Sequence, residues 1–97
     1  MPSTIRVAVT GYGVIGKRVA DAVRAMPDMH LVGVADVATD WRIRTAAELG
    51  IPVFAATEAA QQAMTTAGIP VLGTLEDLVG QVDVVVDATP KKVAAAA

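Results

Sequence analysis

Three glycines are the residues of this sequence whose type and spacing point most directly to chemistry. Gly11, Gly13 and Gly16 form the pattern Gly-Tyr-Gly-Val-Ile-Gly, which follows an apolar run and precedes a helical pattern. A G-x-G-x-x-G turn between a strand and a helix is typical of sites that bind a dinucleotide. The first glycine allows the tight turn, the second lets the backbone approach a pyrophosphate, and the third lets helix and strand pack closely.

The helix that follows this turn contributes to the same site. A helix that begins near Val14 directs its free N–H groups and the positive end of its dipole toward phosphate groups. The sequence therefore predicts that the turn and the start of the helix bind the cofactor, through Gly11, Tyr12, Gly13, Val14, Ile15 and Gly16.

An acidic residue lies at the distance expected for recognition of a ribose. Asp36 follows the apolar run Leu31 to Ala35 and lies 20 residues beyond Gly16. A carboxylate at the end of a second strand can accept a hydrogen bond from a ribose 2′-hydroxyl and repels a 2′-phosphate. The sequence therefore favours NAD over NADP. NADP remains possible if Arg42 and Arg44 neutralise its 2′-phosphate rather than form a solvated helix face.

Apolar runs and helical patterns alternate along the chain and predict the elements that position these residues. Apolar runs are typical of parallel strands buried on both faces, and helical periodicity or capping residues indicate the helices between them. We expect strands at Ile5 to Val9, His30 to Ala35, Pro52 to Ala55, after Gly68 and at Val82 to Val86, and helices from about Val14, after Thr39 or Asp40 to about Leu49, after Thr57, and at Leu75 to Val79. Gly50 stands where a left-handed helix cap is expected, and Thr74 with Asp77 forms a capping-box pattern.

These elements predict an α/β fold, a Rossmann-like parallel sheet with helices on both faces. A complete doubly wound fold has two mononucleotide-binding halves, and 97 residues are short for it. We therefore expect residues 1–97 to form one NAD(P)-binding domain, truncated to about the first half of the fold and without a catalytic domain. Such a half-fold leaves a sheet edge unpaired and an apolar face uncovered, which predicts a homo-oligomer.

Composition and charge exclude several classes of function. Hydrophobic residues make up 54% of the sequence and charged residues 19%, which excludes a disordered chain. The net charge is −2 and basic residues cluster only in pairs, so no nucleic-acid partner is expected. The sequence has no apolar stretch of about 18 residues and no basic region leading into an apolar one, which predicts no membrane association and a cytoplasmic protein. Without cysteine it has no disulfide or thiolate metal site, and we assign no metal ligand.

Three blocks of the sequence resemble the archaeal-type (type II) glyceraldehyde-3-phosphate dehydrogenases. They are residues 7–22 around the glycine turn, residues 67–74 and residues 84–90, and they keep their order along the chain. In that family the N-terminal domain binds NAD or NADP, and a second domain completes the site that oxidises an aldehyde phosphate with inorganic phosphate. The resemblance implies cofactor contacts at the glycine turn, and it places Thr89 and Pro90 near the nicotinamide.

Three departures from the family pattern bear on function. The family usually has a basic or polar residue where Asp36 stands, and it often has glycines where Lys91 and Lys92 follow Pro90. The resemblance also implies a cysteine thiolate that attacks the aldehyde, so that the adduct gives hydride to the nicotinamide and leaves a thioester for phosphate to cleave. The family's cysteine and histidine lie beyond the equivalent of Ala97. We therefore assign no catalytic residue and expect the chain alone to lack phosphorylating dehydrogenase activity.

Two other functions share the same N-terminal pattern. One is the N-terminal half of another two-domain NAD(P) oxidoreductase, of the homoserine dehydrogenase or dihydrodipicolinate reductase type. The other is a stand-alone nucleotide-binding or sensor module that catalyses nothing. The downstream catalytic sequence would separate the first from the dehydrogenase, and the length of the natural reading frame would separate the second.

Overall fold

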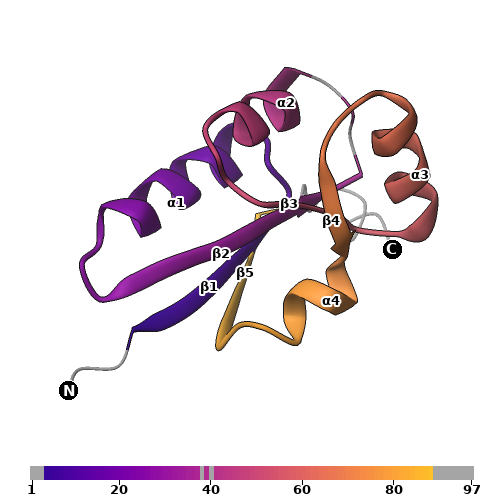
Figure 1. The fold of residues 1–97 in the computed structure, drawn as a ribbon. Helices are drawn as coiled ribbons and strands as arrows, with labels where there is room; N and C mark the ends of the chain where they lie inside the picture. The colour runs from indigo at the N-terminus through magenta and orange to yellow at the C-terminus, as the bar shows by residue number, and fades with distance from the viewer. Residues whose placement is uncertain (1–3, 38, 40, 89–97) are drawn as a thin grey trace, which may run out of the picture.

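Five parallel strands and four helices alternate along the part of the chain that the structure describes (Figure 1). The computed structural model describes residues 4–37, 39 and 41–88. The elements are β1 Ile5–Thr10, α1 Val14–Ala25, β2 Met29–Asp36, α2 Trp41–Glu48, β3 Val53–Ala55, α3 Glu58–Thr66, β4 Val71–Thr74, α4 Leu75–Val79 and β5 Val84–Asp87. The strands form one sheet in the order β4-β3-β2-β1-β5, and every pairing is parallel. The predicted Rossmann-like α/β fold is confirmed.

Helices cover both faces of the sheet, as predicted, but unequally. Parallel connections are right-handed, so the three steps from β1 to β4, all in one direction, place α1, α2 and α3 on one face. The return from β4 to β5 places α4 on the opposite face, and Figure 1 shows α1 and α2 on the other side of the sheet from α4. Two buried clusters follow this division. The larger contains Val23, Ile43 and Met64 from the three helices, and the smaller packs Leu78 of α4 against Phe54.

The strand order reverses next to β1, and this reversal determines where a ligand can bind. β1 pairs with β2 on one side, with Val9 opposite Val34, and with β5 on the other, with Val9 opposite Val86. Open parallel sheets bind ligands in the crevice outside the carboxyl ends of the strands at such a switch point. Here that crevice lies beyond Thr10 and Asp87, the last residues of β1 and β5.

An ion pair joins β1 and β5 at the opposite, amino end of the sheet. The Asp83 carboxylate accepts hydrogen bonds from the backbone N–H of Arg6 at 3.0 Å and from its guanidinium at 3.0 and 3.3 Å. These bonds, those from the side chain above all, hold the pKa of Asp83 below its usual range. The pair holds β5 in register with β1 before the strand begins, because the Asp83 N–H also donates to the Arg6 carbonyl at 2.9 Å.

The local signals in the sequence place most element ends to within one residue. The Thr57 hydroxyl caps α3 by accepting from the Ala60 N–H at 3.1 Å, and the Thr74 N–H donates to Asp77 at 2.9 Å in the expected capping box. Gly50 and Gly68 both have φ of 81°, the left-handed conformation that allows glycine to end a helix.

The expected start of the last strand is wrong by two residues. Val82 belongs to the turn that follows α4. Its N–H donates to the Val79 carbonyl at 3.4 Å, and its side chain packs against the smaller buried cluster, which contains Leu78 of α4. Pairing with β1 begins only at Val84. The apolar run from 82 to 86 therefore belongs partly to the turn after α4 and partly to β5.

Candidate functional site

The glycine turn leaves the carboxyl end of β1 and is held against the end of β2. Gly11 has φ of 82°, a conformation that favours glycine, and its N–H donates to the Ala35 carbonyl at 2.7 Å. The chain then enters α1 at Val14. The first glycine thus makes the tight turn that the sequence predicts.

Gly16 allows α1 to pack directly on this turn. A Cβ atom at Gly16 would collide with the carbonyl oxygen of Gly11 and would touch the Cβ of Ala88 at 3.6 Å. The third glycine is therefore required by close packing of helix, turn and the end of β5. The steric role predicted for it is confirmed.

Gly13, unlike Gly16, is not required by packing within the chain, because a Cβ atom there would meet nothing within 4 Å. Gly13 is the N-cap residue of α1, where no side chain caps the helix and no acidic residue stands in the first turn. Val14 and Ile15 follow it with exposed fractions of 57% and 66%. The start of α1 is therefore exposed and has no capping side chain, and a glycine with open space beside it precedes the helix; this arrangement fits a phosphate group.

Asp36 ends β2 beside the glycine turn and is half-buried. Its Oδ2 atom accepts from the Tyr12 N–H at 2.7 Å, and its Oδ1 atom accepts from the Val37 N–H at 2.7 Å. The structure therefore places Asp36 next to the turn, as the sequence predicts, and shows contacts with the turn that the sequence did not indicate.

A pocket of about 270 Å³ opens on the α4 side of this edge. Its walls come from the carboxyl ends of β1, β2 and β5, from the residue after β3 and from the start of α4: Thr10, Gly11, Ala35, Asp36, Val37, Ala56, Leu75 and Asp87. The lining is mainly apolar, and its polar groups include Asp36 and the Thr10 hydroxyl, which donates to Asp87 at 3.1 Å. Of these lining residues the sequence predicted only Gly11 and Asp36 as cofactor contacts; the others, Ala56 and Leu75 among them, had no signal beyond their position at or near element ends.

The side chain of Tyr12 points away from this site into the core. It is 1% exposed and packs in the cluster beneath α1, α2 and α3. Burial raises the pKa of the phenol, and the nearby carboxylate of Asp21 adds to the shift. Within the described ranges its hydroxyl has no hydrogen-bond partner. Tyr12 was predicted to contact cofactor, and this orientation leaves only its backbone for such a contact.

We expect Tyr12→Phe to leave nucleotide affinity unchanged and to raise the free energy of unfolding by up to about 1 kcal/mol. The reason is that a buried hydroxyl without a partner costs desolvation without a compensating bond. Urea unfolding of the variant and the wild type measures the difference. A loss of stability above about 1 kcal/mol would show that the hydroxyl has a partner.

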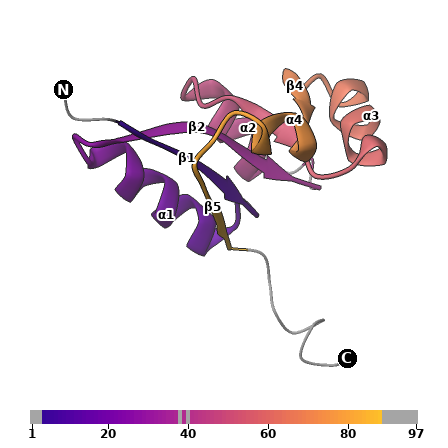
Figure 2. The same cartoon turned by 90° about the horizontal axis from the view of Figure 1, so that it is seen from below.

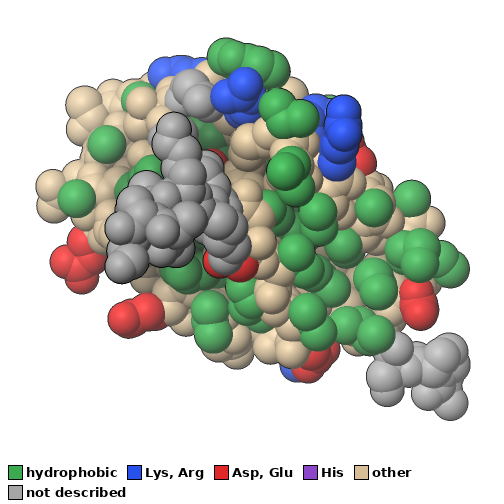
Figure 3. Space-filling model, turned by 180° about the vertical axis from the view of Figure 1, so that it is seen from behind, with side chains coloured by type: hydrophobic (Ala, Val, Ile, Leu, Met, Phe, Trp, Pro, Cys, Tyr) green, Lys and Arg blue, Asp and Glu red, His purple; other side chains and the backbone are tan. Residues whose placement is uncertain are grey.

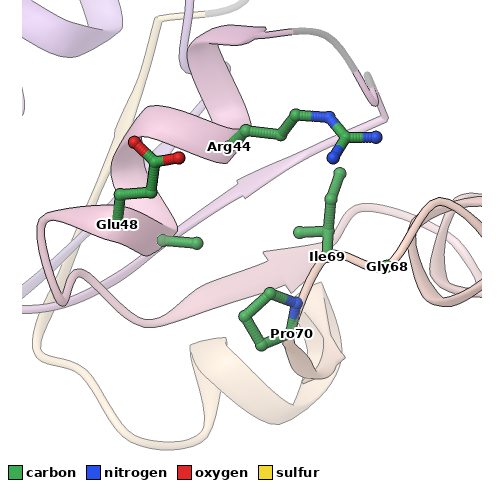
Figure 4. A pocket seen from close by; sticks show the side chains of 6 residues that line it. Arg44, Glu48, Gly68, Ile69 and Pro70 are labelled. Carbon is green, nitrogen blue, oxygen red and sulfur yellow. The ribbon is translucent and has the colours of Figure 1, made fainter.

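The two arginines of α2, Arg42 and Arg44, contact different parts of the molecule. Arg44 lines a separate pocket of about 210 Å³ between α2 and the segment after α3 (Figure 4). Its guanidinium donates to the Ala67 carbonyl at 3.0 Å. The guanidinium of Arg42 lies 5.1 Å from the ring centre of Trp41, which is 64% exposed. Arg44 therefore contacts the end of α3, whereas Arg42 and Trp41 form a stacked pair at the start of α2. Thr89, Pro90, Lys91 and Lys92 lie outside the described residues.

Two negative findings apply to the described part of the chain. No helix there is long and apolar enough to cross a membrane. No group of three or more histidine or acidic side chains in the same residues is arranged to hold a metal ion.

Comparisons with known proteins agree with the predicted resemblance. The sequence model of the family described as dihydrodipicolinate reductase, N-terminus, matches residues 5–97. A glyceraldehyde-3-phosphate dehydrogenase from Pyrococcus furiosus is 51% identical over 86 residues, which are 89% of this chain and 26% of the relative. The corresponding enzyme from Pyrococcus abyssi is 50% identical over 91 residues, or 94% and 27% of the two chains, and that from Methanothermobacter thermautotrophicus is 46% identical over 91 residues, with the same coverage.

These matches have two consequences. The likeness to archaeal-type glyceraldehyde-3-phosphate dehydrogenases is confirmed over nearly the whole chain, and the domain is of the pyridine-nucleotide-binding kind, for NAD or NADP. The chain spans about a quarter of the length of these relatives.

Proposed function

We propose that this chain, which belongs to the family of dihydrodipicolinate reductase N-terminal domains, binds NAD along the carboxyl edge of its sheet. The observation that carries the proposal is the open side of Gly13 at the uncapped start of α1, directly beside the carboxylate of Asp36. An uncapped helix start next to a glycine turn is the arrangement that binds the pyrophosphate in dinucleotide-binding folds.

Each part of the nucleotide has a matching part of the site. The pyrophosphate takes the N–H groups of Gly13, Val14 and Ile15, where the helix dipole favours negative charge. The adenosine ribose lies against Asp36, and the adenine base enters the apolar pocket formed partly by Leu75. A 2′-phosphate beside the Asp36 carboxylate would place like charges together, so NAD is preferred over NADP. The resemblance adds Thr89 and Pro90 on the nicotinamide side.

This proposal is tested by titrating the labelled chain with nucleotide fragments while recording amide NMR shifts. AMP and ADP-ribose should shift the amides of Gly13, Val14 and Val37, whereas nicotinamide mononucleotide should shift them little. Shifts confined to His30 and its neighbours, at the amino end of β2, would place the ligand at the wrong edge of the sheet.

We further propose that the chain corresponds to the N-terminal, cofactor-binding part of a phosphorylating glyceraldehyde-3-phosphate dehydrogenase-like oxidoreductase of the cytoplasm. Its 51% identity to the Pyrococcus furiosus enzyme supports this assignment. Bound NAD would supply a hydride acceptor to such an enzyme. A second candidate is the N-terminal part of a dihydrodipicolinate reductase, which the family description favours.

The purified chain is expected to catalyse no oxidation of an aldehyde phosphate. It has no cysteine, and the proposed reaction requires a thiolate nucleophile. An assay with glyceraldehyde 3-phosphate, inorganic phosphate and NAD should give no NADH above the rate of a Gly13→Val control. Enzyme-dependent NADH formation would show that another group replaces the thiolate.

We also propose that the chain forms a homo-oligomer through the free edge of β5. This strand lies at the edge of the sheet that the described residues form (Figure 2). Its residues Val84 and Val85 are 45% and 42% exposed. Figure 3 faces this edge and shows hydrophobic side chains gathered across it. Unpaired apolar edges favour pairing with another strand. Light scattering during gel filtration should give twice the chain mass or more, and Val85→Lys should reduce it to one chain mass; a monomeric wild type would contradict the proposal.

A further inference from the structure

One carboxylate connects the glycine turn to the neighbouring strand. Oδ2 of Asp36 accepts from the Tyr12 N–H and Oδ1 accepts from the Val37 N–H, both at 2.7 Å. Distances of this length are typical of hydrogen bonds to a charged acceptor, which are roughly twice as strong as bonds between neutral groups. Asp36 is itself held in place, because its carbonyl accepts from the Ala56 N–H at 2.9 Å in the pairing with β3.

The turn needs such a partner because the strand ladder stops short of it. The Gly11 N–H is bonded to the Ala35 carbonyl, but the Tyr12 N–H lies in the turn between two glycines, beyond the last residue pair of β1 and β2. The Tyr12 residue is buried, and a buried N–H without an acceptor costs about 1–3 kcal/mol. The Asp36 carboxylate removes this cost and fixes the turn between Gly11 and α1.

We propose that Asp36 is a positioning residue that holds the glycine turn in its nucleotide-binding conformation before any nucleotide arrives. The same side chain lines the pocket beside the turn. Asp36 therefore has two roles: it recognises the ribose, and it fixes the glycine turn through the hydrogen bond from the Tyr12 N–H. The effect on affinity rests on the proposed function, whereas the effect on the turn does not.

This double role predicts how cofactor preference responds to substitution. Removing the carboxylate relieves repulsion of a 2′-phosphate but also releases the Tyr12 N–H. Asp36→Ala should therefore weaken binding of both NAD and NADP by about tenfold or more, instead of converting the site to NADP. Asp36→Asn keeps one acceptor oxygen and loses the charge. It should retain most of the order of the turn while the preference for NAD over NADP falls.

The experiment measures hydrogen exchange of the Tyr12 amide in the nucleotide-free chain, together with calorimetric binding of NAD and NADP. We expect the Tyr12 amide to be protected in the wild type and to exchange at least about tenfold faster in Asp36→Ala, with the amides of Val9 and Val34 unchanged. Asp28→Asn, an exposed carboxylate near the opposite end of the sheet, is the matched control and should change neither quantity.

The two readouts separate failure of this proposal from failure of the proposed function. If neither cofactor binds the wild type, the binding function is wrong, and Tyr12 exchange still decides whether Asp36 holds the turn. A wild-type Tyr12 amide that exchanges as fast as a solvent-exposed turn overturns the proposal without any variant. So does an Asp36→Ala chain that keeps Tyr12 protected and gains affinity for NADP. If Asp36→Ala does not fold, the wild type and Asp36→Asn supply the result.

Discussion

Gly16→Ala is expected to destabilise the chain by about 3 kcal/mol, a large part of the 5–15 kcal/mol that holds a typical domain folded. The added Cβ atom collides with the carbonyl oxygen of Gly11, a backbone atom that cannot rotate away. Helix propensity alone would favour alanine by about 1 kcal/mol at this position in α1. Urea unfolding of the variant and the wild type gives the difference.

Gly80→Ala is the matched control for this substitution. Gly80 has φ of −65°, and a Cβ atom there would meet the nearest backbone atom at an ordinary distance of 3.6 Å. Its replacement should leave stability unchanged or raise it by about 0.5–1 kcal/mol, because alanine restricts the unfolded chain. If Gly16→Ala were as stable as Gly80→Ala, the close contact of α1 with the turn would be wrong.

Gly13→Val is expected to abolish nucleotide binding without unfolding the chain. The backbone at Gly13 is extended, with φ of −85° and ψ of −156°. The negative φ is one that L-residues adopt, and a Cβ atom there would meet nothing within 4 Å. The valine side chain would instead fill the space in which we place the pyrophosphate. Affinity should fall by about 100-fold or more, which corresponds to about 2.7 kcal/mol.

Comparing Gly13→Ala with Gly13→Val shows whether affinity falls because the side chain fills the phosphate space or because α1 is destabilised. Gly13→Ala adds one carbon to the same open side and should reduce NAD affinity less than Gly13→Val does. Both variants should unfold within about 1 kcal/mol of the wild type, because Gly13 is only half-buried and a Cβ atom there would meet nothing within 4 Å. Full NAD affinity in Gly13→Val would mean that the nucleotide does not approach this residue.

Local patterns predicted much of the fold because its turns and caps depend on neighbouring residues. Gly50 and Thr57 each act through contacts within a few residues, so the sequence shows them directly. Val82 could not be assigned from an apolar run, because apolar side chains serve the turn after α4 as well as the strand. The distribution of helices over the two faces depends on strand order, which no local pattern contains.

The sequence predicted which backbone segments come together at the candidate site, but not where all of its side chains point. The spacing of Gly11, Gly16 and Asp36 follows from one strand, one helix and the next strand, and the structure brings these residues together as expected. The sequence could not predict that the Tyr12 side chain points into the core, because Tyr12 lies between two glycines and outside any helix or strand whose periodicity would indicate a buried face. Leu75 reaches the pocket only because α4 crosses the opposite face of the sheet.

Calorimetric titration of the purified chain with NAD and then with NADP tests most directly whether this edge of the sheet is a pyridine-nucleotide site. We predict one NAD bound per chain, with NADP at least about tenfold weaker because the Asp36 carboxylate opposes its 2′-phosphate. A folded chain that binds neither nucleotide would contradict the proposed binding function. Equal binding of both would contradict the role of Asp36 in choosing between them.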